Sequence, residues 1–125
     1  MTAMNAKSTR EFFVSKNNEL EIKLASSPDM TPGELAYRLG QLTAVSDMYD
    51  WLVKHAKHEF EAEDFIDYIE AQRKKARASA YSQAVQIDDA TTFEVKRKLD
   101  LGKVMEYYLA ATQLKDRKEK LEEGT

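Results

Sequence analysis

The chain has 125 residues, 33% of them charged and 42% hydrophobic, and its 19 basic and 22 acidic side chains leave a net charge of −3. The absence of cysteine excludes disulfides and thiolate metal sites, and the near balance of charge directs the whole molecule toward neither nucleic acid nor membrane. With only four Gly and two Pro, the composition predicts a single all-α domain over residues 1–125, a helical hairpin or bundle of three to four helices.

The sequence predicts no membrane span and no signal peptide. No apolar run approaches the ~20 residues that span a bilayer, and the start of the chain lacks the apolar core of a signal peptide. We therefore expect no membrane contact and a cytoplasmic location. Residues 1–7 and 114–125 are expected to be loose ends, the second because it is almost entirely charged.

The first helix is predicted over residues 9–25, because Ser8 and Glu11 fit a capping box. Leu20, Ile22 and Leu24 also alternate as in a short strand, which is the competing interpretation. The segment SSPDM at 26–30 then breaks the chain. Because this connection is short, we expect the helices on either side of it to be antiparallel neighbours.

Residues 31–58 contain the clearest helical signal in the sequence. Thr31 is a suitable N-cap, Pro32 fits the first helical position, and Glu34 completes a capping box. The helix then shows an apolar seam with the alternating spacing of four and three that is typical of lengthwise helix packing. The seam consists of Leu35, Leu39, Leu42, Ser46, Tyr49, Val53 and Ala56, with Val45, Met48 and Leu52 beside it.

A strip of small residues follows the same helix at intervals of four, namely Ala36, Gly40 and Ala44. A helical Gly costs about 1 kcal/mol relative to Ala, so close approach of a second backbone would explain it. The strip indicates either a docking site for a partner helix or ordinary close packing within one bundle.

Charge is segregated after residue 58. Residues 59–70 contain six acids and no base, whereas residues 73–77 contain four bases and no acid. One helix over about 61–84 would place these groups favourably in the helix dipole. Glu63, Asp67 and Glu70 would share one face, but a face this charged is more often solvated than catalytic.

The last helix is predicted over residues 92–121, after a turn at 86–92, with Thr91 and Glu94 as its capping box. The alternative is an α+β fold with a small hairpin near 82–101, since Phe93, Val95, Leu99 and Leu101 also fit an alternating pattern. For the helix, we expect the core face to consist of Val95, Leu99, Gly102, Met105, Leu109 and Thr112, flanked by Leu101 and Tyr108.

No catalytic motif or cofactor-binding motif occurs in the sequence, so we expect no enzyme activity and no small-molecule ligand. His55 and His58 lie three residues apart, with Glu59 and Glu61 close by, and could bind zinc only if a further ligand came from elsewhere. Two solvated histidines near a helix end explain the pattern more simply. We therefore assign neither catalytic nor metal-binding residues.

Three basic clusters suggest nucleic acid as the alternative partner. The third, at 115–120, is diluted by acids, and the net negative charge argues against the class. The residues that would bind nucleic acid are Arg73, Lys74, Lys75 and Arg77 in the first cluster and Lys96, Arg97 and Lys98, with Lys103, in the second.

We expect protein binding or assembly as the main function, with a second copy of the chain as the partner. Trp and Tyr are common interface anchors, and long amphipathic helices offer more apolar surface than small alanine-rich faces can cover. Such a protein could be an adaptor, an inhibitor, or an accessory or virion component of a virus, in which case it would occupy the host cytoplasm or the virion. The expected binding residues are Tyr37, Gly40, Tyr49, Trp51 and Leu52.

Overall fold

The computed structural model describes residues 2–82 and 90–124, with the backbone alone for residues 90–93. Its elements in chain order are β1 (Ala3–Asn5), α1 (Ala6–Ala25), α2 (Pro32–His55), β2 (Glu59–Glu61), α3 (Ala62–Ser82) and α4 (Ala90–Glu123). The helices pack against one another, which confirms the predicted all-α bundle. In this described part of the chain, no helix is both long enough and apolar enough to cross a membrane.

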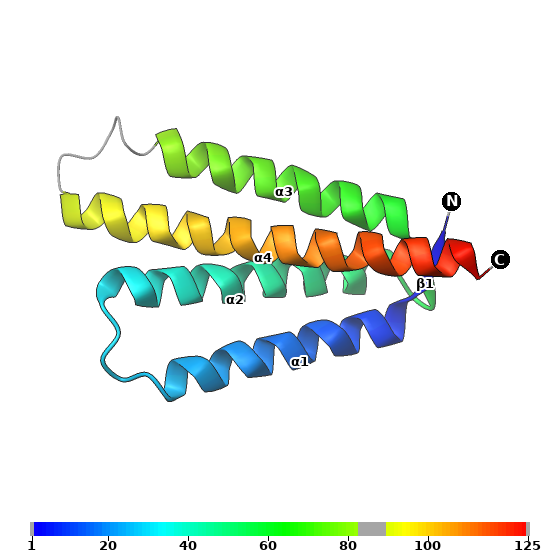
Figure 1. Ribbon diagram of the computed structural model, residues 1–125, viewed down its shortest axis with the longest axis horizontal. Helices are drawn as coiled ribbons and strands as arrows, with labels where there is room; N and C mark the ends of the chain where they lie inside the picture. The colour runs from blue at the N-terminus through cyan, green and yellow to red at the C-terminus, as the bar shows by residue number, and fades with distance from the viewer. Residues whose placement is uncertain (1, 83–89, 125) are drawn as a thin grey trace.

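The helices alternate in direction along the chain, with α4 lying between α2 and α3 and with α1 packed on α2 (Figure 1). Consequently α2 and α4 run parallel to each other, and α1 and α3 run opposite to both. Both chain termini lie at the end of the bundle that carries the two strands.

The start of α2 is built as the sequence predicts. The Thr31 side chain accepts a hydrogen bond from the backbone N–H of Glu34 at 3.1 Å, and Pro32 occupies the first helical position. The helix ends where Ala56 adopts an extended conformation, three residues before β2 begins.

Two glycines bring α2 and α4 into backbone contact. A Cβ atom on Gly40 would lie 2.0 Å from the carbonyl oxygen of Leu99, and one on Gly102 would lie 2.1 Å from that of Tyr37. Each helix therefore presents a Gly to the backbone of the other. The small-residue strip of α2 is thus an internal packing surface of the bundle, the second of the two interpretations that its spacing allowed.

The predicted seam of α2, in contrast, is not its core face. Leu35, Leu39 and Val53 are 44%, 43% and 57% exposed, and Ser46 is exposed as well. Leu42 and Tyr49 are half-buried, and Ala56 alone among the seam residues is buried. The reason is the glycine contact with α4, which turns the opposite side of α2 inward. The buried residues of α2 are Gly33, Ala36, Gly40, Gln41, Ala44, Val45, Met48 and Leu52.

The expectation of a loose tail at residues 1–7 is wrong for the described residues of that segment. Residues 3–5 form β1, which pairs antiparallel with β2 so that Met4 faces Phe60. Met4 is only 2% exposed and belongs to the hydrophobic core. The cap of α1 is also Asn5 rather than Ser8, because the Asn5 side chain accepts a hydrogen bond from the Ser8 N–H at 2.8 Å.

The far end of the chain is also ordered, contrary to expectation. Helix α4 continues to Glu123, Leu114 is buried, and Arg117 donates a hydrogen bond to Ser8 of α1 at 3.1 Å. At its other end α4 already begins at Ala90, before the predicted Thr91 cap. Residues 93–101 are therefore helical, which excludes the second strand of the alternative hairpin. Its proposed first strand, at 85–87, lies outside the described residues.

The predicted core face of α4 is confirmed at Gly102, which is buried, whereas Val95, Leu99 and Leu109 are only half-buried. Met105 and Thr112 point outward, and the inward positions are mostly small or polar because α2 and α3 both approach closely. The buried residues of α4 between 94 and 123 are Asp100, Gly102, Glu106, Tyr107, Ala110, Ala111 and Leu114.

Aromatic side chains fill the core at the end that carries the strands. Phe65 of α3 stacks on Trp51 of α2 at a centroid distance of 4.8 Å. It also meets Phe13 of α1 edge to face at 5.8 Å and Phe60 of β2 at 5.5 Å. This cluster joins three helices and the strand pair, so that β1 is held against the same core.

Candidate interaction surfaces

The five residues predicted to bind protein lie in different environments. Gly40 and Leu52 are buried in the bundle, so they are not available to a partner. Trp51 is half-buried among other rings, with Tyr68 at 5.8 Å and His55 at 4.8 Å. Tyr37 and Tyr49 are half-exposed and border surface hollows.

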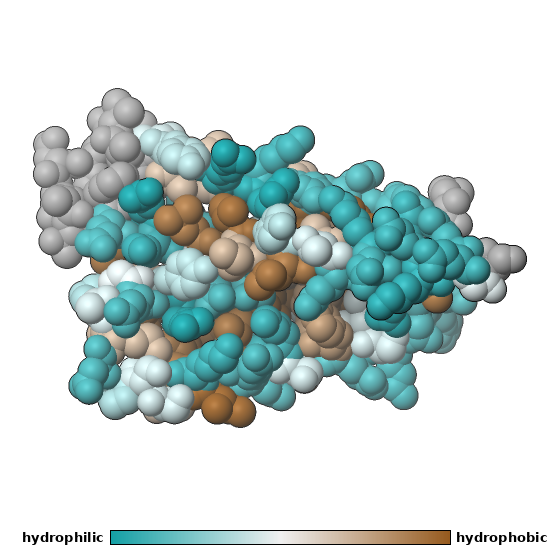
Figure 2. Space-filling view, in the orientation of Figure 1, coloured by the Kyte–Doolittle hydropathy of each residue, from teal (hydrophilic) through white to brown (hydrophobic). Residues whose placement is uncertain are grey.

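A groove that sequence reasoning missed lies over α4. It has a volume of about 330 Å³ and is lined by Leu101, Val104, Met105 and Tyr108 of α4, Tyr37 of α2 and Arg73 of α3. Met105 and Tyr108 remain 41% and 51% exposed. In Figure 2, apolar side chains reach the surface over the middle of α4, between the flanking helices. The spacing of these residues was visible in the sequence, but it could not tell an outward face from an inward one.

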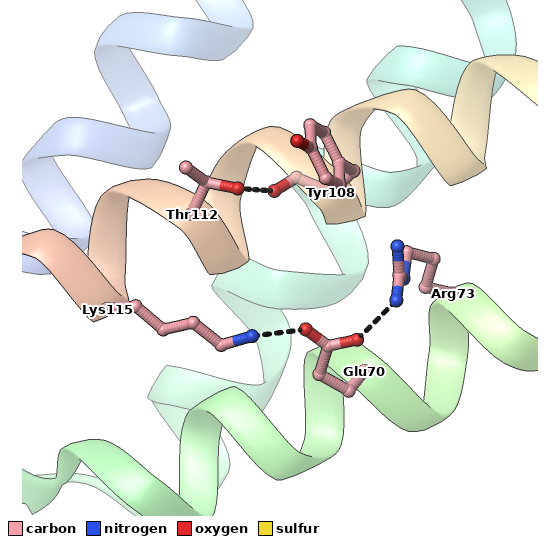
Figure 3. A network of polar contacts seen from close by, with 5 residues as sticks. All are labelled: Glu70, Arg73, Tyr108, Thr112 and Lys115. Carbon is pink, nitrogen blue, oxygen red and sulfur yellow. Dashed lines mark hydrogen bonds and ion pairs between the residues drawn. The ribbon is translucent and has the colours of Figure 1, made fainter.

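Arg73 forms the α3 wall of this groove. Its guanidinium lies 5.8 Å from the centre of the Tyr108 ring and 2.9 Å from a carboxylate oxygen of Glu70. Lys115 of α4 reaches the other oxygen of Glu70, also at 2.9 Å (Figure 3). The hydrogen bond from Lys115, supported by the charge of Arg73, lowers the pKa of Glu70. These contacts tie α3 to α4 beside the apolar floor.

The first two basic clusters lie toward one end of the bundle, because α3 and α4 are antiparallel neighbours. Lys74, Lys75 and Arg77 are exposed on α3. Lys96 and Arg97 are exposed on α4, while Lys98 and Lys103 are half-buried. None of these seven forms an ion pair with another described residue, whereas Arg73 is already paired with Glu70.

His55 and His58 lie in different surroundings. His55 packs its ring on Trp51, and His58 is exposed and uses its backbone carbonyl to accept a hydrogen bond from Ala6. Within residues 2–82 and 90–124, no group of three or more His, Asp or Glu side chains is placed to hold a metal ion. A hollow beside His55 is also lined by Glu61, whose Oε2 atom is buried without a hydrogen-bond partner among the described residues.

Polar groups are buried where α4 meets α2. Gln41 donates a hydrogen bond to Glu106 at 3.0 Å and accepts one from Arg38 at 3.1 Å. Burial raises the pKa of Glu106, and the charges of Lys16, Glu19 and Lys23 on α1 also act on its carboxylate. Further along, the Tyr107 hydroxyl donates to Asp47 at 3.1 Å, and burial raises the pKa of Tyr107. Each shift thus has a structural cause within the helix packing.

A polar cluster closes the bundle where the termini meet. Glu63 of α3 accepts a hydrogen bond from the Thr2 N–H at 3.2 Å and pairs with Lys118 of α4 at 3.3 Å. Backbone hydrogen bonds and Lys118 lower the pKa of Glu63 to about 2. The Thr2 hydroxyl donates to Glu122 at 2.6 Å. Of the three acids predicted to share a face, Glu63 and Glu70 are therefore ion-paired, while Asp67 is exposed.

Comparison with known proteins adds no relative: no family model matches the chain, and no curated protein or solved structure is significantly similar to it.

Proposed function

We propose that the protein is a non-enzymatic assembly protein that binds a second copy of itself through the outer side of α2. The observation that carries this proposal is that the apolar seam of α2 lies outside the core. Leu35, Leu39 and Val53 remain exposed at positions spaced for lengthwise helix packing. A soluble domain gains free energy by burying such a strip against a partner.

A non-enzymatic role is supported by what the polar groups already do. Glu63 and Glu70 are held in ion pairs between α3 and α4, and Glu106 and Tyr107 are bonded within the helix packing. In each case the polar atoms are engaged by neighbouring side chains of the bundle. An adaptor or a viral accessory role would use the same surface, with another protein as the partner.

The experiment is light scattering on the wild type and on Leu39→Glu, at low and high salt. The wild type should have at least twice the monomer mass of 14.3 kDa, and Leu39→Glu should be a monomer because a charge cannot be buried in an apolar interface. Ala71→Glu adds the same charge at an exposed position of α3 and should leave the mass unchanged. A wild type that is monomeric at all concentrations would contradict self-association.

Nucleic-acid binding is the second candidate, and one observation favours it. The clusters at 73–77 and 96–98 lie toward the same end of the bundle and are largely unpaired among the described residues. If they bind phosphates, an oligonucleotide should raise the mass at low salt only. Reversal of Lys74, Lys75 and Arg77 to Glu should then abolish the effect and leave self-association intact.

A further inference from the structure

The groove over α4 has a lining suited to a helical ligand, and it is separate from the seam of α2. Leu101, Val104, Met105 and Tyr108 recur at intervals of three and four, so they form one stripe along the outer face of α4. Tyr37 and Arg73 stand on either side of it, on α2 and α3. An apolar floor between two walls is the form in which an amphipathic helix is commonly bound.

The charges around the groove indicate what kind of segment fits it. Arg77 follows Arg73 by one helical turn on α3, so it extends the same wall. On α4, Arg97 precedes Leu101 by four residues and Lys98 precedes Met105 by seven, so both continue the stripe. Lys115 continues it in the other direction, seven residues beyond Tyr108.

Acidic side chains on this surface are fewer among the described residues. Glu94, seven residues before Leu101, lies on the stripe, and together with Glu34 of α2 it lines a separate hollow beside Lys98. Glu70 beside Arg73 already accepts from both Arg73 and Lys115. Asp116, at the far edge, pairs with Lys120 at 3.1 Å. Arg77, Arg97 and Lys98 have no ion-pair partner among the described residues. The exposed Arg77 and Arg97 therefore leave unpaired positive charge beside the apolar floor.

We propose that this groove binds an amphipathic helical segment of another protein, with apolar side chains on the Met105 stripe and acidic side chains against Arg77 and Arg97. The apolar floor favours a protein segment over nucleic acid, because phosphate backbones need cations rather than apolar contacts. This site does not depend on self-association through α2, since the two surfaces share no residue.

The test uses the five methionines as reporters, with their methyl groups labelled for NMR. The probe is a synthetic helical peptide with Leu at i, i+3, i+4 and i+7 and Glu at the flanking positions, and its control carries Lys in place of every Glu. The acidic peptide should shift the Met105 signal, whereas the signals of the buried Met4 and Met48 should stay unchanged. The basic peptide should shift none of them.

Variants then locate the contact. Met105→Glu and, independently, Tyr108→Ala should weaken the acidic peptide at least tenfold, while Leu39→Glu on the α2 seam should leave its affinity unchanged. Both substituted groove residues are partly exposed, so circular dichroism should show intact helices. For Met105→Glu, whose own methyl reporter is lost, the affinity is read by fluorescence anisotropy of a labelled peptide.

Several results would overturn the proposal. These are equal binding of both peptides, an unmoved Met105 signal with the acidic peptide at about 1 mM, and full binding by both groove variants. A self-associating wild type that Met105→Glu converts to a monomer would assign the groove to a second copy instead. A shift of the Met105 signal by an oligonucleotide in the absence of peptide would also overturn the proposal, because it would assign the basic side chains around the groove to phosphate binding.

Discussion

At the scale of single residues, the contact between Gly40 and the backbone of α4 sets the position of α2. Gly40→Ala should destabilise the fold, because the new Cβ would meet the Leu99 carbonyl, which cannot move without its helix. Overpacking of this kind costs about 1–3 kcal/mol, and better helix propensity recovers at most about 1 kcal/mol. Urea denaturation of the variant measures the difference.

Gly33→Ala is the matched control on the same helix. Its Cβ would lie 3.4 Å from Oε1 of Glu94 and 3.5 Å from Cγ of Lys98, which belong to flexible side chains. We expect no loss of stability and a gain of up to ~1 kcal/mol from helix propensity. Equal stability of Gly40→Ala and Gly33→Ala would show that the two backbones are not in contact.

Glu106 provides a second prediction at the residue scale, because its carboxylate is buried and its pKa is raised. A carboxyl whose pKa is higher in the folded state destabilises the protein once the pH exceeds the unfolded value of 4.5. Glu106→Gln should therefore melt at a higher temperature than the wild type at pH 7, provided that the amide keeps the bond to Gln41. Below pH 4.5 the advantage should disappear. An advantage independent of pH would indicate that packing, not charge, is the cause.

Single residues also show what the sequence can and cannot predict. The Thr31 cap was predictable, because it depends only on residues within one turn. The Asn5 cap was missed because Ser8 and Glu11 offered an equally good local pattern. Asn5 is the last residue of β1, and β1 pairs with residues 59–61, which are far away in the sequence. Burial of Glu106 and Gln41 was not predictable, because such side chains usually face solvent. Their hydrogen bond also joins two helices that are far apart in the sequence.

At the scale of elements, β1 shows that a very short strand can be an integral part of the bundle. Met4→Ala should destabilise the fold by about 2–5 kcal/mol, because it removes a fully buried side chain next to Phe60. Ile22→Ala removes a large apolar side chain that is 68% exposed and should change stability by less than about 0.5 kcal/mol. Denaturant titration of both variants tests this, and similar losses would mean that β1 is not held in the core.

The helices themselves illustrate the limit of periodicity as a predictor. The start of α2 followed from its capping residues, whereas its end did not, because the helix stops at His55 and residues 56–58 of the predicted stretch lie outside it. The choice of buried face did not follow, because both the leucine seam and the small-residue strip are regular. In the structure the small-residue strip is buried, because Gly40 of α2 and Gly102 of α4 let the two backbones come into contact. This contact can be recognised only when the positions of both helices are known. Met105 was assigned to the core for the same reason, because its regular spacing does not show which face of α4 is buried.

At the scale of the whole molecule, Glu63 links the two ends of the chain to α3. Its lowered pKa, about 2 in the folded state against 4.5 unfolded, means that its ionised form stabilises the fold above pH 4.5. This contribution is lost as the pH falls from 4.5 toward 2. Glu63→Gln should therefore melt below the wild type at pH 7, and the difference should shrink toward pH 2.

Thermal unfolding followed by circular dichroism at pH 7, 4.5 and 2 measures this effect. Asp67→Asn serves as the control, because Asp67 is exposed on the same helix. Its melting temperature should follow that of the wild type at each pH. A difference between Glu63→Gln and the wild type that persists at pH 2 would mean that the carboxylate charge is not what holds the ends together.

The proximity of the two chain ends has a topological consequence. Because Thr2 is hydrogen-bonded to Glu122, a short flexible linker could join the termini without displacing a helix. A circular permutant could then be opened between Ser27 and Pro28, in the exposed segment that connects α1 to α2. In such a protein α2 would come first and α1 last, with every described contact between helices retained. We therefore expect the packing of this bundle to be independent of the order in which its helices are synthesised.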